Sequence, residues 1–487
     1  MNKMIPKYLQ KIIDDIKASG YEAYIVGGSV RDILMNQEPK DWDITTNALP
    51  EQILKIFVDA RYENIFGTVL LPIRALAKGD ELKGKLEDVI EITTYRSEQG
   101  YSDRRHPDTI RFETELDKDL ERRDFTINAL AFDPGNKNEV IDLFGGQKDI
   151  KAKIIRAVGE PTDRFKEDAL RMLRAVRFSS QLGFELEPKT QRAITKLAGS
   201  LKFVSKERIR DEFVKIIASE RAYEGIMLLH ECKLLQYILP ELEAGIGINQ
   251  DRHHIYPVFK HNVLSLKYCP SKEWPVRLAA LLHDVAKPKT RKIINNIATF
   301  YNHEYVGARL VDKIMLRLKF SGADQLRVVN LVKNHMFYYN VGEVTAASVR
   351  RLIVKVGKEN LKDLIDLRIA DRLGSGTPKA MPYKLRHLQY MMEKVQNDPI
   401  SVKMLKINGN DLISVLHITP GPKIGAILDV LLSEVIEDPD LNTLAWLKKR
   451  SKELNEFELE ELRLKAKEVI AEKRNEDDKL IKKQYKV

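Results

Sequence analysis

Two aspartates separated by one tryptophan, Asp41 and Asp43 in the stretch DWDI, have the spacing of a metal site. In an extended segment, residues two apart point to the same face and lie about 7 Å apart. Two carboxylates at that distance repel each other unless cations lie between them, and Mg²⁺ prefers oxygen ligands of this kind. A pair of magnesium ions can stabilise both the attacking and the leaving oxygen of a phosphoryl transfer. The sequence therefore predicts magnesium ions on these aspartates.

The residues just before this pair suit the phosphates that such metals accompany. Gly27 and Gly28 follow the apolar run AYIV, and a short helix is expected to begin near Ser29. Glycines allow a phosphate to approach the backbone closely, and a helix N-terminus offers N–H groups to an anion. Arg31 in the first turn can add a charge-assisted contact to the same phosphates. The structural alternative, a turn followed by a strand with exposed acids, requires no ligand.

A second group of residues has the order H…HD…D within helical patterns, and it consists of His261, His283, Asp284 and Asp371. Imidazole and carboxylate ligands together suit a divalent transition metal or magnesium. The HD dipeptide comes late in the run PVRLAALLHDVAKP, near an expected helix end where both side chains can point into a cleft. The order resembles that of the HD phosphohydrolase superfamily, which implies a second divalent metal on these four residues. His303 and His335 match histidines that some members use around a metal, and Lys287 matches a basic residue that often follows the dyad.

Length and composition place these groups in a globular protein with several domains. The chain has 487 residues, of which 43% are hydrophobic and 31% charged. No apolar run approaches the roughly 20 residues that span a bilayer, and the N-terminus lacks the features of a signal peptide. Cys232 and Cys269 have neither metal-ligand nor redox spacing, as is typical of a reducing compartment. We therefore expect a cytoplasmic protein without a membrane partner, and the net charge of +10 favours phosphate-rich nucleic acid as a partner.

Short apolar runs bounded by turns predict strands in the first third of the chain, namely EAYIVGG, TVLLPI, DVIEITTY and TINALAF. A helix from Met4 to about Ser19 precedes them and should stop at Gly20. From Arg164 onward, helical patterns replace the strand patterns. In KEDALRMLRAVRFSSQLGF, apolar residues at helical spacing predict a core face made of Ala169, Met172, Leu173 and Val176.

These shifts divide the chain into four expected domains. An α+β head occupies residues 1–160, and three mostly α-helical domains follow at 161–245, 246–390 and 391–487. Stretches with Gly and Pro before His261 and after Asp371 set the limits of the third domain. The tail from Ser451 is heavily charged, and a solvated or frayed helix is expected there.

With the glycine turn before it, DWD resembles the first motif of the polymerase-beta-type nucleotidyltransferases. That resemblance implies a head of this type with a third carboxylate on a later strand, for which Glu91 in VIEITTYR is the candidate. Further stretches between residues 22 and 215 match, in order, the motifs of the class II tRNA nucleotidyltransferases, the CCA-adding enzymes, and of the closely similar bacterial poly(A) polymerases. They are RRDFTINALAFD from Arg122, DLFGGQKDIKAKIIRAVG from Asp142, RFKEDALRMLRAVRF from Arg164 and SKERIRDEF from Ser205. Five motifs in the family's order make the resemblance specific.

The resemblance implies roles for the residues of these motifs. Gly28 and Arg31 would lie at the phosphates of a nucleotide. Arg123 would contribute a charged donor, and Asp124 would accept from a ribose hydroxyl. Two arginines at three-residue spacing would add to the nucleotide site, with a solvated basic ridge as the structural alternative: Arg174 and Arg177.

In EDALR, Asp168 and Arg171 are expected three residues apart on one helix, where both can meet one planar ligand. An ionised aspartate only accepts hydrogen bonds and an arginine only donates them. Cytosine and adenine both present an amino donor beside a ring-nitrogen acceptor, whereas uracil and guanine present the reverse order. A mismatched base leaves buried groups unpaired, at a cost of about 1–3 kcal/mol per group. The pair would therefore select C and A without a nucleic-acid template.

The resemblance as a whole implies a tRNA nucleotidyltransferase that adds CCA to tRNA 3′ ends from CTP and ATP, with Mg²⁺ as cofactor. The charged stretch at residues 95–112 resembles the flexible loop of full CCA-adding enzymes, and NIFGTVLLPI lacks the basic residues typical of poly(A) polymerases. An A-adding enzyme and a poly(A) polymerase are the alternatives within the family. A metal-dependent HD phosphohydrolase with a nucleotide-binding head is the alternative from another class. The sequence does not decide the oligomeric state.

Overall fold

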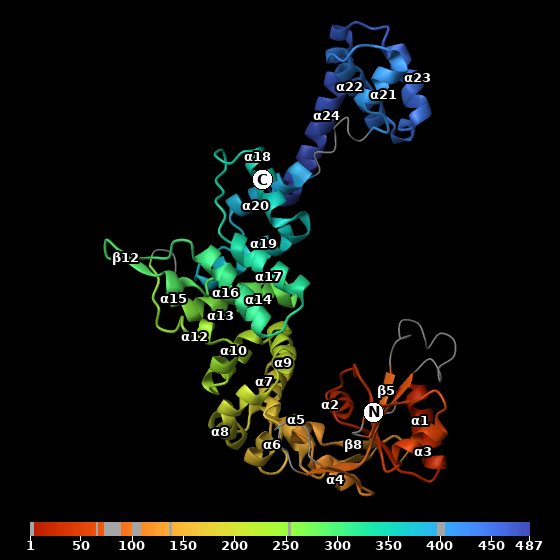
Figure 1. The fold of residues 1–487 in the computed structure, drawn as a ribbon, viewed down its shortest axis with the longest axis vertical. Helices are drawn as coiled ribbons and strands as arrows, with labels where there is room; N and C mark the ends of the chain where they lie inside the picture. Colours follow the sequence, from red (N-terminus) through yellow and green to blue (C-terminus); the bar gives the residue numbers. More distant parts are fainter. Residues whose placement is uncertain are drawn as a thin grey trace. The chain divides into compact units, whose positions relative to one another are not determined.

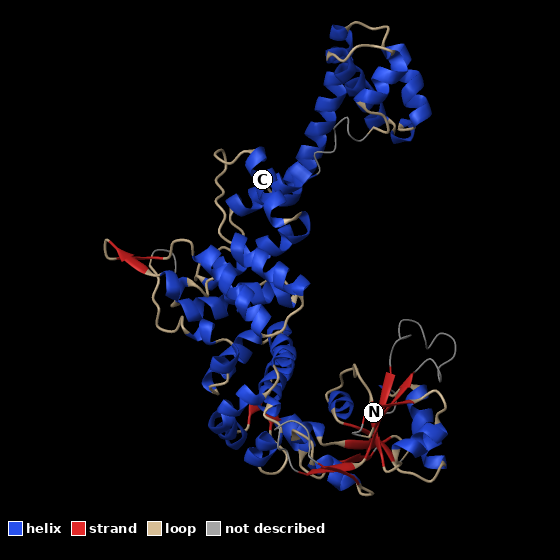
Figure 2. Ribbon diagram, in the orientation of Figure 1, coloured by secondary structure: helices blue, strands red, loops and turns tan. Residues whose placement is uncertain are grey.

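The computed structural model of this protein describes residues 4–64, 67–72, 89–99, 109–135, 139–251, 255–396 and 405–487. The chain divides into two compact units. The first comprises Met1–His335 with Asp366–Thr377, and the second comprises Met336–Ile365 with Pro378–Val487. Most strands gather in the N-terminal part of the first unit, and helices form most of the remainder (Figure 2). No helix in the described part of the chain is long and apolar enough to cross a membrane.

The N-terminal part of the first unit, where Figure 1 labels β5 and β8, contains a mixed sheet. Its strand order is β3-β4-β5-β2-β1-β8-β9. Its strands are β1 (Ala23–Val26), β2 (Asp43–Thr46), β3 (Arg61–Asn64), β4 (Thr68–Pro72), β5 (Val89–Thr94), β8 (Ala131–Asp133) and β9 (Glu139–Ile141). β2 and β5 run parallel, whereas the other neighbours in this order run antiparallel. The α+β head that the sequence predicts is therefore present.

Helix α1 (Lys7–Ala18) packs its apolar face into the core of this sheet. The face repeats at helical spacing and is fully buried at Leu9, Ile12, Ile13 and Ile16. The same core includes the short helix α3 (Pro50–Ile56) and strand residues such as Ile25 and Ile44. The helix ends before Gly20, whose φ of +87° confirms the expected stop.

The run TINALAF forms a strand only in its second half. Thr126–Asn128 is a turn of 3₁₀ helix, η4, and β8 begins at Ala131. The Thr126 hydroxyl donates to the Asp149 carboxylate at 2.7 Å, and the Asn128 amide donates to Asp124 at 3.1 Å. These two side-chain contacts hold Thr126 and Asn128 in the turn. The expected strand is therefore wrong over Thr126–Asn128.

The charged stretch from Tyr95 to Phe112 has paired strands at both ends. β6 (Arg96–Gln99) runs antiparallel to β7 (Thr109–Phe112), with Arg96 opposite Phe112. The expectation of a loop is wrong for these ends because their backbones pair with each other. The middle of the expected loop, residues 100–108, lies outside the described residues.

One group of helices lies around and after the last strands of this sheet, and most of them fall where the sequence predicts helices, from about Arg164 onward. They are α4 (Leu116–Glu121), α5 (Gly146–Ala152), α6 (Pro161–Glu167), α7 (Leu170–Leu182), α8 (Pro188–Leu197), α9 (Lys206–Ala218) and α10 (Ala222–Glu231). The short strands β10 (Ile154–Ile155) and β11 (Glu185–Leu186) pair between them. Helix α7 packs against both α9 and α10, so these three helices form one bundle.

The single helix expected around EDALR is interrupted at Asp168. Helix α6 ends at Glu167, α7 begins at Leu170, and Asp168 between them has an extended backbone with φ −137° and ψ 107°. Asp168 lies one residue before the N-cap of α7, Ala169, and its carboxylate accepts the Leu170 N–H at 2.9 Å, which satisfies an N–H at the start of the new helix. The expected core face is confirmed, because its four residues are fully buried: Ala169, Met172, Leu173 and Val176.

A second helical group in the first unit carries the H…HD…D residues. It contains α11 (Leu235–Ile238), α12 (Pro240–Glu243), α13 (Val258–Lys267), α14 (Trp274–Leu282), α15 (Lys287–Thr290), α16 (His303–Arg317), α17 (Gly322–Asn334) and the part of α19 (Leu361–Gly374) that follows Ile365. α14 packs against both α13 and α17, and α17 packs against α16. The hairpin of β12 (Lys292–Ile294) and β13 (Ile297–Thr299) connects α15 to α16.

The second unit is helical. Its main helices are α18 (Ala346–Val356), α20 (Tyr383–Gln396), α21 (Gly409–Leu416), α22 (Pro422–Glu437), α23 (Leu444–Leu454) and α24 (Leu459–Tyr485). α24 contains most of the charged tail, yet Leu462 and Ala466 of this helix are buried in one core with α22. Asp478 near its end accepts from Lys394 of α20 at 2.5 Å. The expectation of a solvated or frayed tail is therefore wrong at these positions.

Candidate active site and metal centre

A cleft of about 1080 Å³ in the first unit brings together residues that are far apart in the sequence. The turn between β1 and α2 (Gly28–Leu34) forms one side, and residues of α7 and α9 form another. Ten of the residues expected at a nucleotide and its metals line this cleft: Gly28, Arg31, Asp41, Asp43, Arg123, Asp124, Asp168, Arg171, Arg174 and Arg177.

Strand β2 places Asp43 beside Glu91. β2 begins at Asp43, and Asp41 lies at a bend before the strand, so the expectation that one strand carries both aspartates is wrong. Because β2 and β5 are parallel, Asp43 and Glu91 are direct partners in the register. Burial raises the pKa of Asp43, an effect that Arg123 opposes and the charge of Asp41 strengthens. Glu91 is exposed and does not line the cleft; partial desolvation raises its pKa, and the charge of Asp43 adds to it. Bound cations relieve repulsion of this kind.

The glycine turn makes room for a guanidinium close to these carboxylates. Gly27 has a φ of +77°, in the left-handed region that side chains disfavour. A Cβ at this position would lie 3.0 Å from Arg123 Nη1 and 3.8 Å from Asp43 Oδ2. The turn therefore needs glycine for its backbone angle and for the approach of Arg123.

Arg31 is buried and held from two sides. Its Nη1 donates to the Asn128 side chain at 2.7 Å, while Nε and Nη2 donate to Asp32 at 2.9 and 2.7 Å. Helix α2 begins at Gly28, within one residue of the expected start. These contacts fix Arg31 at the wall of the cleft, where a guanidinium can bind a phosphate.

Asp119 anchors the two arginines of the RRD motif. This side chain is fully buried and accepts from Arg122 at 2.6 Å and from Arg123 at 3.1 Å. Burial alone would raise the pKa of Asp119, but the two guanidinium groups hold it below its usual value. Asp119 is not among the site residues expected from the sequence. Its spacing of three and four residues before two arginines is the signal that would have found it.

Asp124 is the next buried acid of the cleft. Its Oδ1 accepts the Phe125 N–H at 2.8 Å and the Asn128 amide at 3.1 Å, while Oδ2 accepts Arg174 Nε at 2.8 Å. Burial opposes ionisation, but Arg174 and Asn128 lower the pKa of Asp124 to about 2. Asp124 is therefore an ionised acceptor that fixes Arg174 in place.

Asp168 and Arg171 line the same cleft but do not pair with each other. The Asp168 carboxylate accepts from Arg208 of α9, with Nη2 at 2.7 Å from Oδ2. Arg171 Nη1 donates to Glu167 at 2.6 Å, and its Nη2 donates to the Arg122 carbonyl at 2.9 Å. The two residues that were expected on one helix thus flank the start of α7. Arg208 was missed, although it lies in the quoted motif SKERIRDEF.

Arg177 is buried rather than part of a solvated ridge. Its Nη1 donates to Glu212 of α9 at 3.2 Å, and its guanidinium lies 4.1 Å from the centre of the Phe178 ring. Burial and the positive charge of Arg174 lower the pKa of Arg177 to about 10. Arg174 and Arg177 therefore both present fixed positive charge to the cleft, which suits an anionic ligand.

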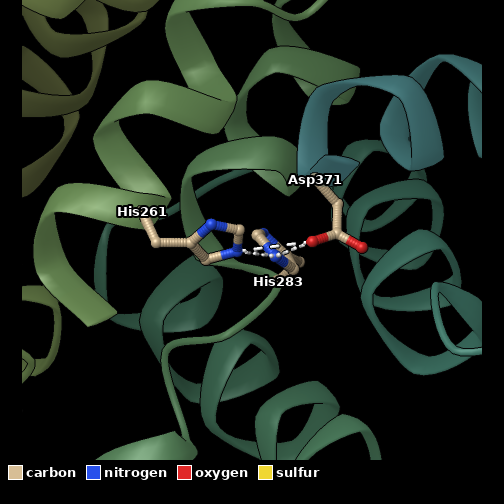
Figure 3. Close-up of side chains that lie close together, drawn as sticks. All are labelled: His261, His283 and Asp371. Atoms are coloured by element: carbon tan, nitrogen blue, oxygen red, sulfur yellow. Dashed lines mark hydrogen bonds and ion pairs between the residues drawn. The ribbon is translucent and has the colours of Figure 1, made fainter. Parts of the chain in front are cut away.

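The second site lies in the helical group around α13 and α14. His261, His283 and Asp371 come from α13, the end of α14 and α19, and their side chains converge (Figure 3). The two Nε2 atoms are 2.9 Å apart, and Asp371 Oδ1 lies 3.4 Å from His261 Nε2 and 3.6 Å from His283 Nε2. All three residues are buried, and their ligand atoms lie close enough together to hold one metal ion.

Asp284 faces two groups of ligands at once. Its Oδ2 lies 3.1 Å from His261 Nε2 and 3.3 Å from His283 Nε2. Its Oδ1 lies 3.1 Å from His303 Nε2 and 3.7 Å from His335 Nε2. The four expected residues therefore meet, and Asp284 forms a second group of possible metal ligands with the two additional histidines.

Backbone carbonyls orient the histidines of this centre. The Nδ1 atoms of three of them lie 2.7–2.9 Å from the carbonyls of Ala280, Phe300 and Val332, and these histidines are His283, His303 and His335. Contacts of this kind fix a metal-binding imidazole with Nε2 toward the ion. Burial, helped by the charge of His283, lowers the pKa of His335 to about 3. A neutral imidazole of this kind is ready to bind a metal.

Lys287 neighbours the shared carboxylate. Its Nζ lies 2.6 Å from Asp284 Oδ2 and donates to Gln250 Oε1 at 2.6 Å. Burial would raise the pKa of Asp284, but Lys287 and His283 hold it well below its usual value. The carboxylate that faces both groups is therefore ionised, which metal binding requires.

Three family models match the chain, and they follow the order of these sites. One described as "Poly A polymerase head domain" matches residues 23–156. One described as "Probable RNA and SrmB- binding site of polymerase A" matches residues 183–246, and one described as "HD domain" matches residues 263–375.

Known proteins are similar to this chain over most of its length. A CCA-adding enzyme of Enterococcus faecalis is 34% identical over 437 residues, which are 88% of this chain and 90% of the relative. An A-adding tRNA nucleotidyltransferase of Deinococcus radiodurans is 38% identical over 333 residues, 65% of this chain and 74% of the relative. The crystal structure of the Bacillus stearothermophilus CCA-adding enzyme in complex with CTP is 26% identical, with a TM-score of 0.59. That similarity covers 93% of this chain and 99% of the solved one.

Proposed function

The chain belongs to the family of the tRNA nucleotidyltransferases, and from that premise we propose that it adds C, C and A to tRNA 3′ ends, using CTP and ATP. The observation that carries this proposal is the shared cleft, which unites the DWD carboxylates with Asp168 and Arg171. The A-adding relative keeps addition of A alone as the alternative within the family.

The carboxylates suit the metal ions that such a transfer uses. Asp41, Asp43 and Glu91 would hold two Mg²⁺ ions, because the burial of Asp43 and its repulsion from the other two carboxylates make cations favourable there. When bound, the ions neutralise charge on the attacking and leaving oxygens. In the transfer, the terminal 3′-hydroxyl of the tRNA attacks the α-phosphorus of the nucleotide, and pyrophosphate leaves.

The arginines and the glycine turn suit the rest of the nucleotide. Arg31 and Arg123 would bind the phosphates, since both are held at the cleft wall near the backbone of Gly28. Asp124 would accept from the ribose hydroxyl, which favours ribonucleotides. Because Asp124 also holds Arg174, sugar and phosphate recognition would be coupled through one ion pair.

Asp168 and Arg171 would read the base. A single acceptor beside a donor matches the amino group and ring nitrogen of cytosine and of adenine, but not the reversed pattern of uracil and guanine. Glu167 holds the Arg171 guanidinium at 2.6 Å, which supports a fixed donor at this position. The protein side chains would thus take the place of a nucleic-acid template.

Incubation with three tRNA substrates tests this proposal. The tRNAs end before the first C, after one C and after CC, and CTP and ATP are supplied separately. We expect C to be added to the first two and A to the third. Addition of A to the third substrate alone would select the A-adding alternative, and tails on unrelated RNA would select a poly(A) polymerase. No incorporation on any substrate would contradict the proposal.

The geometry of the HD residues favours a second activity. Two ligand groups that share Asp284 would hold divalent metal ions, and such ions activate water for attack on a phosphate ester. Damaged tRNA ends that carry a 3′-phosphate or a 2′,3′-cyclic phosphate are the substrates that connect this chemistry to nucleotide addition. We expect Asp284→Ala to remove the hydrolysis of both substrates. Hydrolysis at the wild-type rate by this variant would contradict the assignment.

We also propose four domains with the limits 1–160, 161–245, 246–390 and 391–487, although residues 336–365 and 378–390 of the third belong to the same compact unit as the fourth. The family matches at 23–156, 183–246 and 263–375 each fall within one proposed domain, apart from one residue at the second boundary. Limited proteolysis followed by mass spectrometry checks the limits, because cleavage is expected near residues 160, 245 and 390.

A further inference from the structure

Arg208 of α9 holds the carboxylate of Asp168 at the wall of the cleft. Arg208 Nη2 lies 2.7 Å from Asp168 Oδ2, and Nη1 lies 3.4 Å from Oδ1. The two side chains are 26% and 16% exposed, so solvent reaches the pair only in part. From the other side, the backbone N–H of Leu170 donates to Oδ1 at 2.9 Å. The carboxylate is therefore held both by its own helix start and by a neighbouring helix.

Arg171 has a separate partner of its own. Its guanidinium donates to Glu167 at 2.6 Å and to the backbone carbonyl of Arg122 at 2.9 Å. Asp168 has an extended backbone outside α7, so it is not a helical neighbour of Arg171. Asp168 accepts from Arg208, and Arg171 donates to Glu167. The carboxylate of Asp168 and the guanidinium of Arg171 therefore have different partners.

Helix α9 is a firm support for Arg208. Arg208, Glu212 and Lys215 follow the spacing i, i+4, i+7, which puts them on one face of the helix. Glu212 on that face is buried and accepts from Arg177 of α7 at 3.2 Å. Arg208 and Lys215 line the cleft. The position of the Arg208 fork is therefore set by the packing of α9 against α7.

We infer that Arg208 is a positioning residue for base selection, an inference that rests on the proposed function. A carboxylate oxygen accepts two hydrogen bonds, so the amino group of cytosine or adenine can join Arg208 at Asp168 Oδ2. The last torsion of an aspartate is broad when nothing holds it. A guanidinium fork that binds both oxygens fixes the plane of the carboxylate. With its plane fixed by Arg208, the Asp168 carboxylate accepts a hydrogen bond only from a base whose amino group lies in the right position.

Equilibrium binding of CTP, ATP, UTP and GTP to full-length variants tests the inference. We expect Arg208→Ala to reduce the preference for CTP over UTP by about tenfold or more, the effect of losing one charged hydrogen bond. Arg208→Lys should restore part of the preference, because a point charge attracts the carboxylate but does not fix its plane. Arg210→Ala is the matched control. Arg210 is on the same helix, does not line the cleft and donates to Asp211 at 2.9 Å.

The binding experiment separates this inference from the proposed function. Arg208→Ala with the wild-type preference, or with an equal loss of affinity for all four nucleotides, would overturn the positioning role. Melting temperatures check that the variants fold. If Arg208→Ala does not fold, the nucleotide preference of Arg208→Lys is compared with that of the wild type instead. A wild-type protein that prefers CTP to UTP but adds nothing to tRNA would contradict the proposed function alone. A wild-type protein without that preference would overturn the role of Arg208.

Discussion

Buried acids hold the arginines of the cleft in place. Asp119 binds Arg122 and Arg123, and Asp124 binds Arg174. Glu212 performs the same task for Arg177. Charged groups fixed by partners of opposite sign need little rearrangement when an anionic ligand arrives. At the scale of single residues, the acids are thus as much a part of the candidate site as the arginines.

The buried ion pair of Asp124 predicts a dependence of stability on pH. The pKa of Asp124 is about 2 in the folded protein, lowered from 3.8. A lowered pKa stabilises the folded state fully above the unfolded value, and this contribution is lost as the pH falls from about 4 to about 2. Its size is about 2 kcal/mol. Asp124→Asn should therefore reduce the loss of unfolding free energy over this range, as measured by urea titrations. An unchanged pH dependence would contradict the role of this pair.

Asp43→Asn should abolish nucleotide addition while the protein still binds CTP. Removing a carboxylate ligand costs several kcal/mol of transition-state stabilisation, so we expect a fall in rate of at least about 100-fold. Binding of CTP without divalent ions should change little, because in the proposed site the arginines would hold the phosphates. Asp59→Asn, at an exposed position, is the control. Initial rates of C addition measure the effect, and a variant as active as the control would contradict the role of Asp43 in the candidate site.

At the scale of elements, two backbone features shape the cleft. The turn at Gly27 lets Arg123 approach, and the break at Asp168 separates α6 from α7. In a continuous helix, Asp168 and Arg171 would lie on one surface, because they are three residues apart. The break instead lets Asp168 start α7 and meet Arg208 from α9. Both features are places where the chain leaves regular structure.

Gly27→Ala tests the turn against a glycine with the same backbone strain. A side chain at a positive φ costs about 1–2 kcal/mol, and at Gly27 it would also press on Arg123 Nη1 at 3.0 Å. Gly247 has a φ of +71° with nothing within 4 Å of a Cβ. Both alanine variants should melt at lower temperature, but Gly27→Ala alone should weaken CTP binding, by at least about tenfold. Equal CTP affinities for the two variants would contradict the crowding argument.

Two leucines of helix α24, one buried and one exposed, test whether this helix is part of the core of the second unit. Leu462 is fully buried in the core with α22, whereas Leu464 is 67% exposed. Leu462→Ala should destabilise the unit by about 2–5 kcal/mol, and Leu464→Ala should stay within about 0.5 kcal/mol of the wild type. Hydrogen exchange of the amides of α22 and α24 measures the difference. Equal protection in both variants would show that the start of this helix is not anchored.

At the scale of the whole molecule, the first unit carries two candidate sites. Among the described residues, the two ligand groups around Asp284 do not line the cleft, so the candidate sites have no residue in common. Separate sites without shared partners act additively. Asp284→Ala should therefore leave C addition unchanged while hydrolysis is lost, and Asp43→Asn should do the reverse. Loss of both activities in either variant would contradict independent sites.

The net charge of the chain predicts how tRNA binding depends on salt. With 81 basic and 71 acidic residues, the chain is positive by +10. Binding to a polyanion releases counterions, so the affinity for tRNA should fall at least about tenfold between 50 and 200 mM salt. The affinity for CTP should fall less, because a nucleotide carries far fewer phosphates. Filter binding at a series of salt concentrations gives both slopes, and equal slopes would contradict an extended contact with tRNA.

The sequence by itself determined the family, the α+β head and the helical remainder, because ordered motifs and hydrophobic periodicity are local properties of a chain. The comparisons confirm that family and fold. The neighbours of Glu91 and Asp371 do not follow from the sequence, since strand register and helix packing decide what lies beside them.

Only the tertiary structure decided the partners of the charged groups. Nothing in EDALR indicates that Asp168 leaves the helix or that Arg208, forty residues later, binds it. The same holds for the two faces of Asp284, because the contacts with His303 and His335 arise only when α16 and α17 pack together. Side-chain types are written in the sequence, whereas the pairing of buried charges depends on distances that only packing sets.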